Sequence, residues 1–467
     1  MDNLESIVFN QVDFVIKSPS FKIIFSYMDE RSIPFVREFI LRLLKLNSCK
    51  PKHLADYFEF TQREAEVAIK DLTDKRWVEW NEDGTIGLST KGRHLFDRNS
   101  KGPKIPKLQE RAQRLHLELL DRNFIPKIRT SKDNRNALEL NVLNKDLSES
   151  RDVAKRQFQI DFINLKEDKV IDNLSRDVEL YKIDLVEHLY TDFFRFNQPF
   201  DINAQDGTQL ERSDLEINRS DNIQQKITEV LDQYRPSQNN LPEIMQSMES
   251  LKDPDTLKII VGGKFDFNKF LDLEMNVNNK TYFVGQIYHQ SKIFDQIAKL
   301  ASKLETTKKL SWIAPSDFYW GKQSKLIEMI NSISDGAMVK RNKEKVRLYN
   351  FKIYLPLPEE SKSLRNEVRD LKHQFRELLP KDNLYGVFEG FLKANTEVIV
   401  LEDTLAIVCY HVQLPDKYDV TLPVGFMTTD IEQVNHIATV IQSYLNSPIF
   451  DDDSKFDSYD FGSFKNL

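Results

Sequence analysis

The C-terminal part of the chain, from Leu257 onward, alternates segments of strand pattern with segments of helical pattern, and this alternation constrains the fold most. Short apolar runs have the length of buried strands, and the longer runs between them repeat apolar residues at helical spacing. Strands that alternate with helices are typical of a sheet covered by helices on both faces. We therefore predict a three-layer α/β domain over residues 256–446. The segments that carry the pattern are "LSWIAP", "GKQSKLIEMINSIS", "VRLYNFKIYLPL", "SLRNEVRDLKHQFRELL", "TEVIVLEDTLAIVCYHV" and "DIEQVNHIATVIQSYL".

Residues 1–100 have the pattern of several helices followed by a hairpin. The segment "FVREFILRLLKL" repeats apolar side chains at helical spacing, and "KPKHLADYFEF" predicts a short second helix. Thr61 and Glu64 have the spacing of a capping box, which marks the start of a third helix. The segment "WVEWNEDGTIGLST" then predicts two short strands joined by a turn at Asp83 and Gly84.

This order of elements, together with the closing phrase "LSTKGRHLF", resembles the winged-helix domain of bacterial regulators over residues 33–96. The resemblance implies that the third helix enters the major groove of DNA. Its candidate base-contacting residues are Gln62, Arg63 and Lys70. Acidic residues on this helix equal the basic ones in number, so a module that docks proteins stays open as the alternative.

A basic segment follows the predicted hairpin. Residues 91–135 hold thirteen basic and five acidic residues, in a chain whose net charge is −7. Such a local excess favours contact with DNA phosphates, whereas the chain as a whole is not expected to coat nucleic acid. The alternative is that these residues neutralise the acidic middle of the same chain. The candidate phosphate contacts are Lys91, Arg93, Arg98, Lys101, Lys104 and Lys107.

Two further regions precede the α/β pattern. Residues 101–136 predict a basic linker followed by a helix, because Gly and Pro mark "NSKGPKIPK" as a linker and "LQERAQRLHLELLDR" is helical in character. Residues 137–255 predict an acidic, partly irregular helical region. Within it, residues 195–222 have little periodicity and predict a long loop, whereas "NIQQKITEVLDQY" predicts an amphipathic helix.

Composition excludes several classes of function. The two cysteines, Cys49 and Cys409, are too few for a disulfide framework or a Cys-based zinc site, and this usage fits a reducing cytosol. Neither GxxxxGKS/T nor GxGxxG occurs, which argues against a P-loop nucleotide site. The N-terminus lacks the pattern of a signal peptide, and no apolar run reaches the ~18 residues of a membrane span. We therefore expect a cytoplasmic protein with no cofactor, no metal and no membrane partner.

The stretch "KANTEVIVLEDTLAIV", from Lys393 to Val408, has the layout of a strand, a tight turn and a second strand. With "LSWIAPSDFY" before it, this order resembles one half of the phospholipase D-like fold. That family's signature, H-x-K-x-x-x-x-D, supplies a nucleophilic His and a phosphate-binding Lys. At this spacing the sequence has Asn395, Glu397 and Glu402. Asn lacks an imidazole nitrogen and Glu repels phosphate, so the resemblance implies a degenerate domain that has lost catalysis.

Two other interpretations of this region stay open. An atypical phosphodiesterase or nuclease would need Asn395, Glu397 and Asp317 to converge in one concave site. Asp317 belongs to "PSDFYWGKQSK", where a strand is expected to pass into a helix, and α/β ligand sites lie at such turns. The other interpretation is a solvated turn and a helix cap with no role beyond structure. The sequence leaves enzymatic activity undecided and favours its absence.

The last segment, residues 447–467, interleaves acidic and aromatic residues. An exposed cluster of aromatic side chains is unfavourable unless it is used, so the segment predicts an acidic–aromatic tail that docks on a protein partner. A disordered, solubilising tail is the alternative. The candidate docking residues are Asp451, Asp452, Asp453, Phe456, Phe461 and Phe464.

Together these features predict an α+β, multi-domain protein with an N-terminal winged helix and a C-terminal phospholipase D-like α/β domain. The leading hypothesis is a non-enzymatic protein that binds double-stranded DNA through its winged helix. It would act as a regulator, or as an accessory subunit of a bacterial DNA-processing or phage-defence complex, either as a homo-oligomer or in a larger assembly. The alternatives are the atypical phosphodiesterase or nuclease, and a protein-docking scaffold that does not bind DNA.

Overall fold

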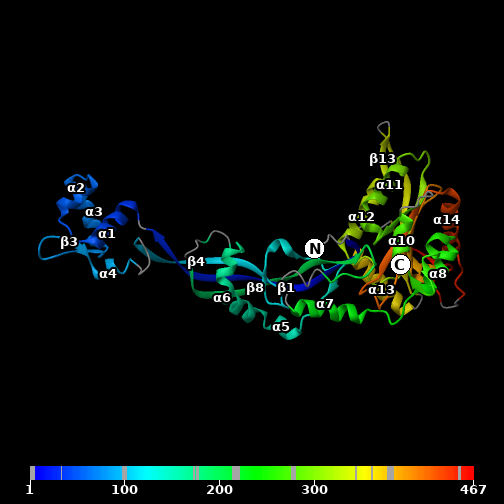
Figure 1. Ribbon diagram of the computed structural model, residues 1–467, viewed down its shortest axis with the longest axis horizontal. Coiled ribbons are helices and arrows are strands. Elements are labelled where there is room, and N and C mark those ends of the chain that lie inside the picture. Colours follow the sequence, from blue (N-terminus) through cyan, green and yellow to red (C-terminus); the bar gives the residue numbers. More distant parts are fainter. Residues whose placement is uncertain are drawn as a thin grey trace. The chain divides into compact units, whose positions relative to one another are not determined.

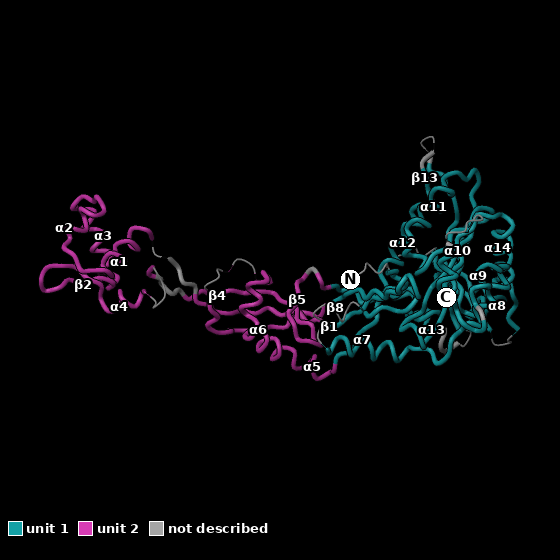
Figure 2. Tube along the Cα trace, viewed as in Figure 1, with its two compact units in different colours: residues 1–17, 131–142, 193–467 teal, residues 18–130, 143–192 magenta. Residues whose placement is uncertain are grey.

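The computed structural model describes residues 6–32, 34–96, 102–171, 174, 178–212, 221–274, 280–341, 344–358, 361–375, 383–450 and 454–467. The chain forms two compact units, each assembled from separate stretches of sequence (Figure 2). The first unit contains residues 1–17, 131–142 and 193–467, and the second contains residues 18–130 and 143–192. Both mix helices with strands, which confirms the expected multi-domain α and β architecture. Among the described helices, none has both the length and the apolar character needed to cross a membrane.

The first unit is built on a sheet that is surrounded by helices (Figure 1). This sheet has eight strands in the order β11-β19-β18-β17-β12-β15-β16-β20. β12, β15 and β16 run parallel to one another, and the other neighbouring pairs are antiparallel. Every residue of β17 and β18 is buried, so both faces of the sheet are covered there. The strands are β11 (Lys280–Val284), β12 (Lys308–Ile313), β15 (Tyr349–Leu357), β16 (Leu384–Phe388), β17 (Thr396–Leu401), β18 (Leu405–Val412), β19 (Leu422–Thr428) and β20 (Asp460–Ser463).

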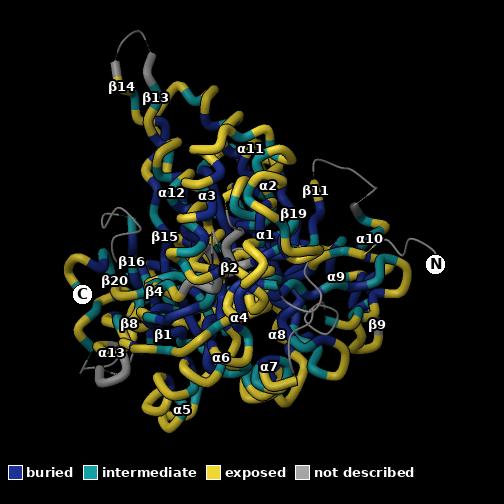
Figure 3. Tube along the Cα trace, turned by 90° about the vertical axis from the view of Figure 1, so that its left-hand side faces the viewer, coloured by how far each residue is buried: buried dark blue, intermediate teal, exposed yellow. Residues whose placement is uncertain are grey.

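Helices supply that cover. On one face, α11 (Ser291–Ala301) and α12 (Ser324–Gly336) contribute to a core centred on Trp312 of β12. On the other face, α14 (Ile431–Leu445) packs against β17 and β18. The outward sides of such helices are exposed, as α11 shows in Figure 3. The layers agree with the expectation of an α/β domain.

Shorter elements complete the first unit. Two small hairpins pair β9 with β10 and β13 with β14. Their bounds are β9 (Ile260–Val261), β10 (Lys264–Phe265), β13 (Met338–Arg341) and β14 (Glu344–Arg347). The remaining helices are α7 (Asp221–Gln233), α8 (Leu241–Ser250), α9 (Pro254–Leu257), α10 (Phe267–Glu274) and α13 (Ser361–Phe375).

A second sheet has the order β5-β4-β1-β8-β6, with β7 beside β1. Its long strands, β1 (Ser6–Ser32) and β8 (Glu179–Asn203), contribute residues to both units. Within the second unit, β1 pairs antiparallel with β4 (Lys104–Leu117). The shorter elements are β5 (Phe124–Ile125), β6 (Thr130–Ser131), β7 (Leu138–Glu139) and α5 (Asn144–Ser148).

The core of the second unit lies between this sheet and α6 (Ser150–Glu167). Phe25 of β1 packs against Phe158 and Phe162 of α6, with ring centroids 5.0 and 5.6 Å apart. The three rings are at most 3% exposed, so they form a closed aromatic core.

A helical module, residues 35–93, is inserted in the chain between β1 and β4. Its helices pack around a core of their own that includes Ile40, Leu54 and Ile69. β2 and β3 pair as a hairpin, and Cys49 forms an isolated bridge to Ile86. The predicted order of three helices and a hairpin is therefore observed, and the capping box at the start of α3 is confirmed. The elements are α1 (Phe35–Leu46), α2 (Pro51–Phe58), α3 (Gln62–Asp74), β2 (Val78–Trp80), β3 (Ile86–Leu88) and α4 (Thr90–Arg93).

The prediction of a linker and helix over residues 101–136 was wrong. The segment "LQERAQRLHLELLDR" begins inside β4, which pairs with β1 from Lys104 to His116. A long partner strand supplies a hydrogen bond to every second residue, and this overrides the helical propensity of Leu, Gln, Glu and Arg.

Three other expectations are corrected. Residues 6–32 form β1, so no helix precedes the helical module there. The loop expected from Arg195 begins instead as the end of β8, which reaches Asn203. The region 137–255 contains α6, α7 and α8 as expected of a helical region, but β8 runs through it. β16 and β19 belong to the α/β sheet and were not predicted.

Candidate functional site

α3 turns its polar face to solvent because its apolar residues point into the helical module. Ile69 and Leu72 are at most 4% exposed and fix the orientation of the helix. The three residues predicted to contact bases, Gln62, Arg63 and Lys70, are all exposed on the helix. The placement of these residues therefore agrees with a helix that could lie against a ligand.

Two acidic side chains of α3 are engaged within the helix itself. Glu64 Oε2 accepts hydrogen bonds from the backbone N–H and the hydroxyl of Thr61, both at 2.8 Å. The bond from the Thr61 backbone is the main reason that the pKa of Glu64 lies below its usual value. Glu66 Oε1 accepts a hydrogen bond from Gln62 Nε2 at 3.0 Å.

A third acidic side chain, Asp71, is neutralised by its neighbours. It pairs with Arg37 Nε at 2.6 Å and also with Lys75. The hydrogen bond from Lys75 is the main cause of the lowered pKa of Asp71. Arg63 and Lys70, in contrast, make no ion pair with any other described residue. α3 itself carries four acidic and two basic residues, but three of the four acidic side chains are engaged within the module and both cations are uncommitted.

The basic segment after the hairpin is only partly described. Lys91 and Arg93 are exposed on α4. Arg98 and Lys101 lie outside the described residues. Lys104 and Lys107 belong to the backbone of β4, opposite Ser32 and Asp29, so they are not in a linker. Their side chains also lie outside the described part of the chain.

An apolar groove opens beside Arg63. It has a volume of about 540 Å³ and is lined by residues of α1, of α3 and of the chain before α3. Val36 and Val67 are 44% and 63% exposed, which is high for aliphatic side chains within helices. The lining residues are Val36, Phe60, Thr61, Arg63, Glu64, Val67 and Ala68.

A separate polar cluster lies in the α/β sheet of the first unit, around His411 of β18. His411 Nδ1 lies 2.9 Å from Asp317 Oδ2, and His411 Nε2 lies 3.2 Å from Glu397 Oε2. Asp317 follows the end of β12, and Glu397 belongs to β17. All three side chains are at most 1% exposed. We call these three residues the buried triad.

The other oxygens of the buried triad are satisfied as well. Glu397 Oε1 accepts hydrogen bonds from the indole N–H groups of Trp312 and Trp320 at 2.7 and 2.9 Å. Asp317 Oδ1 accepts one from the Thr421 hydroxyl at 2.8 Å. Each carboxylate therefore uses both of its oxygens inside the protein. Buried polar groups that are fully paired stabilise one arrangement of the strands around them.

The electrostatics of the triad favour a charged imidazole. Burial by itself lowers the pKa of His411, but the hydrogen bonds to the carboxylates of Asp317 and Glu397 outweigh it. The pKa of His411 is consequently raised well above its usual value. A positive imidazolium between two carboxylates has its counter-charge inside the protein, and the remaining carboxylate oxygens accept hydrogen bonds from Trp312, Trp320 and Thr421.

Glu397, His411 and Cys409 also offer ligand atoms that lie within 4.8 Å of one another. Such donors suit zinc, yet three ligands are one short of the usual structural set. Burial raises the pKa of the Cys409 thiol to about 11, so the thiolate that a metal needs is scarce at neutral pH. Glu397 and His411 are already bonded to each other. We therefore assign these residues to the hydrogen-bonded network and no metal to them.

The residues of the degenerate motif separate in space. Glu397 is sealed in the triad, so the interpretation of a solvated turn was wrong for this residue. The Asn395 side chain donates to the Lys393 carbonyl at 2.8 Å, and only its backbone carbonyl contacts the triad, where it accepts the N–H of His411 at 2.8 Å. Glu402 lies beyond the other end of β17, where it accepts from the Lys309 backbone N–H at 3.3 Å. Asp317 and Glu397 thus converge as the enzymatic alternative required, but Asn395 does not join them, and the site is closed.

His411 is the residue that sequence reasoning missed. The turn between β17 and β18 places Glu397 opposite Cys409, so His411 is its diagonal neighbour on the same face. The hairpin register that the sequence predicts would have sufficed to find this pair.

The expected docking tail is corrected for its aromatic residues. β20 pairs with β16 and closes one edge of the sheet. Phe461 and Phe464 are 5% and 3% exposed, so they belong to the core of this chain and are not free to bind a partner. Phe456 stacks on Phe461, with ring centroids 4.2 Å apart. The acidic residues Asp451, Asp452 and Asp453 lie outside the described residues.

Comparisons with known proteins do not assign a family to this chain. No protein-family model matches the chain, and no curated protein matches it. Among solved structures, the chain is similar to NucT from Helicobacter pylori, with 12% sequence identity and a TM-score of 0.20. The match covers 35% of this chain and 93% of NucT. At that TM-score we base no argument on the likeness.

Proposed function

We propose that the protein is a non-enzymatic, DNA-associated protein whose helical module is a winged helix that binds duplex DNA. The observation that carries the proposal is the state of the charges on α3. Three of its four acidic groups, Glu64, Glu66 and Asp71, are engaged within the module, and the fourth, Asp74, is exposed at the far end of the helix. Arg63 and Lys70 are exposed and unpaired among the described residues. Such cations can contact bases or phosphates without first breaking an internal ion pair.

The order of elements supports the same proposal. A winged helix has three helices, a short strand after the first helix and a hairpin after the third, and its third helix reads the major groove. The bridge from Cys49 to Ile86 supplies the short strand, and β2 and β3 supply the hairpin. α3 is the third helix and carries Arg63 and Lys70.

The closed triad in the first unit supports the non-enzymatic part of the proposal. A nucleophile or general base must reach a substrate, and the side chains of Glu397 and His411 are both 0% exposed. We assign the α/β domain the role of a degenerate, phospholipase D-like platform, which serves a regulator or an accessory subunit of a bacterial DNA-processing or defence complex.

The test is the fluorescence anisotropy of a random-sequence duplex titrated with the full chain across a series of salt concentrations. Log affinity decreases as log salt concentration rises. If Arg63 and Lys70 each contact a phosphate, changing both to Gln should make this negative slope shallower by about 2. The control is Lys303→Gln, an exposed lysine of the first unit, which should leave the slope unchanged. Equal slopes for the double variant and the wild type would reject α3 as the DNA-binding face.

A protein-docking module is the second candidate, and the apolar groove beside Arg63 favours it. The exposed aliphatic surface of Val36 and Val67 is more useful to a protein partner than to a phosphate backbone. The titration separates the two candidates with the substitution Val67→Asp. If Val67→Asp no longer binds a protein partner that co-purifies with the wild type but still binds DNA, the result favours docking. If the variant loses affinity for DNA alone, the result favours the winged helix.

A further inference from the structure

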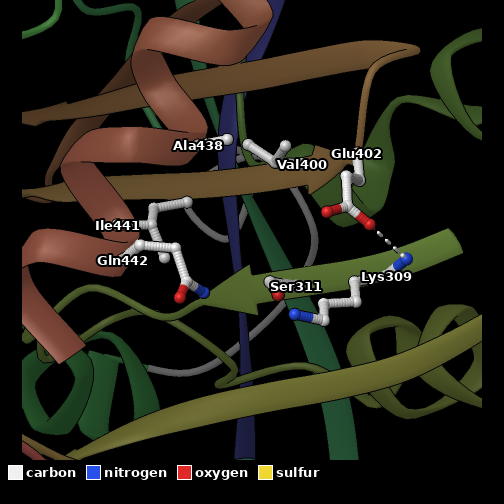
Figure 4. Close-up of a pocket in the computed structure, with 7 residues that line it drawn as sticks. All are labelled: Lys309, Ser311, Val400, Glu402, Ala438, Ile441 and Gln442. Atoms are coloured by element: carbon white, nitrogen blue, oxygen red, sulfur yellow. Dashed lines mark hydrogen bonds between the residues drawn. The ribbon is translucent and has the colours of Figure 1, made fainter. Parts of the chain in front are cut away.

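A pocket lies in the first unit between the sheet and α14, on the face opposite Trp312 (Figure 4). Successive residues of a strand point to opposite faces, so Lys309 and Ser311 of β12 share the pocket face, while Leu310 and Trp312 enter the core. The pocket has a volume of about 180 Å³. Its lining residues are Lys309, Ser311, Val400, Glu402, Ala438, Ile441 and Gln442.

The walls of the pocket combine an apolar floor with a polar rim. Val400 of β17 and Ile441 of α14 are at most 4% exposed and form the floor. Ala438 lies one helical turn before Ile441 and Gln442, and its small side chain leaves room between α14 and the strands. The space is therefore built by the residue types at these positions and is not a gap between loops.

Polar groups from three elements converge on this space. Figure 4 shows the side chains of Lys309, Ser311 and Gln442 turned toward one another. None of the three side chains has a hydrogen bond or an ion pair with another residue in the part of the chain that the structure describes. The adjacent Lys308 behaves differently, since its ammonium is 2.7 Å from Asp403 Oδ2. Lys309 is thus an exposed cation at the edge of the pocket, and it has no ion-pair partner among the described residues.

Glu402 adds an acceptor at the rim. Its Oε2 accepts the backbone N–H of Lys309 at 3.3 Å, and its backbone N–H donates to the Lys309 carbonyl at 3.0 Å. The backbone bond holds Glu402 beside β12, and the bond to Oε2 orients its carboxylate toward the pocket. Oε1 remains available to accept a hydrogen bond from a ligand. An anion held by Lys309 would be repelled by Glu402 unless the anion brings a donor of its own toward Oε1.

We propose that this pocket binds a small oxyanion that carries a hydrogen-bond donor, such as monohydrogen phosphate or a hydroxycarboxylate. The Lys309 ammonium, the Ser311 hydroxyl and the Gln442 amide N–H donate to the oxyanion, and Glu402 Oε1 accepts from its hydroxyl. A water molecule occupies about 30 Å³ in the liquid, so the pocket holds a ligand of this size but not a nucleotide. The site is separate from α3 and does not depend on DNA binding.

The test is isothermal titration calorimetry of the full chain with three probes at low ionic strength. Inorganic phosphate and glycolate carry a donor, and acetate is the matched carboxylate without one. We expect saturable binding of phosphate, of glycolate or of both, with a dissociation constant on the order of 1 mM, and no measurable binding of acetate. The phosphate and glycolate arms decide which source of the oxyanion the pocket prefers.

Two variants connect the binding to the pocket. Lys309→Gln should lower the affinity for the probe at least about tenfold, because a charge-assisted hydrogen bond is lost. The control Lys308→Gln changes a neighbouring lysine that is already paired and should bind like the wild type. Glu402→Gln should allow acetate to bind, because it removes the negative charge that repels an anion at the rim of the pocket. Lys309 is exposed, so its substitution leaves the fold intact.

Absence of saturable heat with both phosphate and glycolate would overturn the proposal. Equal weakening by the two lysine variants would also overturn it, because that result indicates general attraction to positive charge.

Discussion

Asp317 and His411 form a sealed pair: the carboxylate Oδ2 lies 2.9 Å from the ring Nδ1, and the two side chains are 1% and 0% exposed. The pair ties the chain after β12 to β18, and Glu397 extends it to β17. The chain after β12 is therefore tied to the β17–β18 hairpin, which is distant from it in sequence, by one set of polar contacts in the α/β sheet. Removing His411 would leave two buried carboxylates without a cation, whereas removing the charge of Asp317 would leave the imidazole bonded to Glu397 alone.

Asp317→Asn should lower the free energy of unfolding of the first unit by roughly 1–3 kcal/mol, since it removes a charge-assisted hydrogen bond to His411 and leaves the imidazole with Glu397 alone. Trp312 and Trp320 both donate to Glu397 and report the network by fluorescence when Trp77 and Trp80 are changed to Phe. Urea unfolding in that background measures the loss.

The matched control for this substitution is Asp335→Asn. Asp335 is exposed on α12, and its substitution should change stability by less than about 0.5 kcal/mol. A similar small effect for Asp317→Asn would mean that the pair adds no stability to the sheet.

The stability that His411 contributes should depend on pH in one direction. Burial opposes its charge, yet the hydrogen bonds to the two carboxylates raise its pKa well above the ordinary 6.5. A group whose pKa is raised by folding stabilises the protein fully below its unfolded pKa and loses that contribution as the pH rises through the folded pKa. The difference in unfolding free energy between the wild type and His411→Gln should therefore be largest at or below pH 6.5 and shrink only in alkaline solution. A difference that grows with pH would show that the imidazole is neutral in the fold.

Enzymatic activity offers a direct check on the closed site. We expect the wild type to hydrolyse bis(p-nitrophenyl) phosphate no faster than His411→Asn, because neither His411 nor Glu397 reaches solvent. Hydrolysis by the wild type that His411→Asn abolishes would restore the phosphodiesterase interpretation.

The sequence predicted the parts of the fold that local pattern controls. The helices of the helical module and the hairpin of β17 and β18 follow from apolar spacing, from the Thr61 cap and from a tight turn. Elements whose structure depends on partners that are distant in sequence were not predicted correctly. β4 has helical residues but is a strand because β1 lies beside it, and the pairing between them spans the whole inserted module.

The same limit applies to the candidate site. Glu397 was singled out for its position in a motif, but its true partners, His411, Trp312 and Trp320, come from other strands and from the chain beyond β12. Phe461 and Phe464 were taken as exposed because composition does not reveal that a terminal segment closes a sheet. Burial of a charged or aromatic side chain is a property of tertiary structure, and local sequence carries little of it.

Glu118 should make the second unit less stable as the pH rises. Burial, aided by the charge of Asp121, raises its pKa to about 7. An acid whose pKa is raised in the fold contributes stability below its unfolded pKa of about 4.5 and loses that contribution as the pH passes about 7. The shift corresponds to about 3 kcal/mol. Hydrogen exchange of the β4 amides from pH 5 to pH 8 should show this loss in the wild type but not in Glu118→Gln.

Glu149→Gln is the control, because Glu149 is 57% exposed and should leave the pH dependence as in the wild type. If Glu118→Gln follows the wild-type curve, then Glu118 is charged throughout this range and its burial is compensated.

Phe461 and Phe450 test whether the last segment is part of the fold. Phe461 is 5% exposed between β20 and the core, whereas Phe450 is 91% exposed. Phe461→Ala should lower the unfolding free energy of the first unit by roughly 3–5 kcal/mol, as is usual for a buried aromatic ring. Phe450→Ala removes the same atoms and should cost less than about 0.5 kcal/mol. Urea unfolding followed by Trp312 and Trp320 measures both. If both substitutions change the unfolding free energy by a similar, small amount, the last segment is not part of the fold and is free to bind a partner.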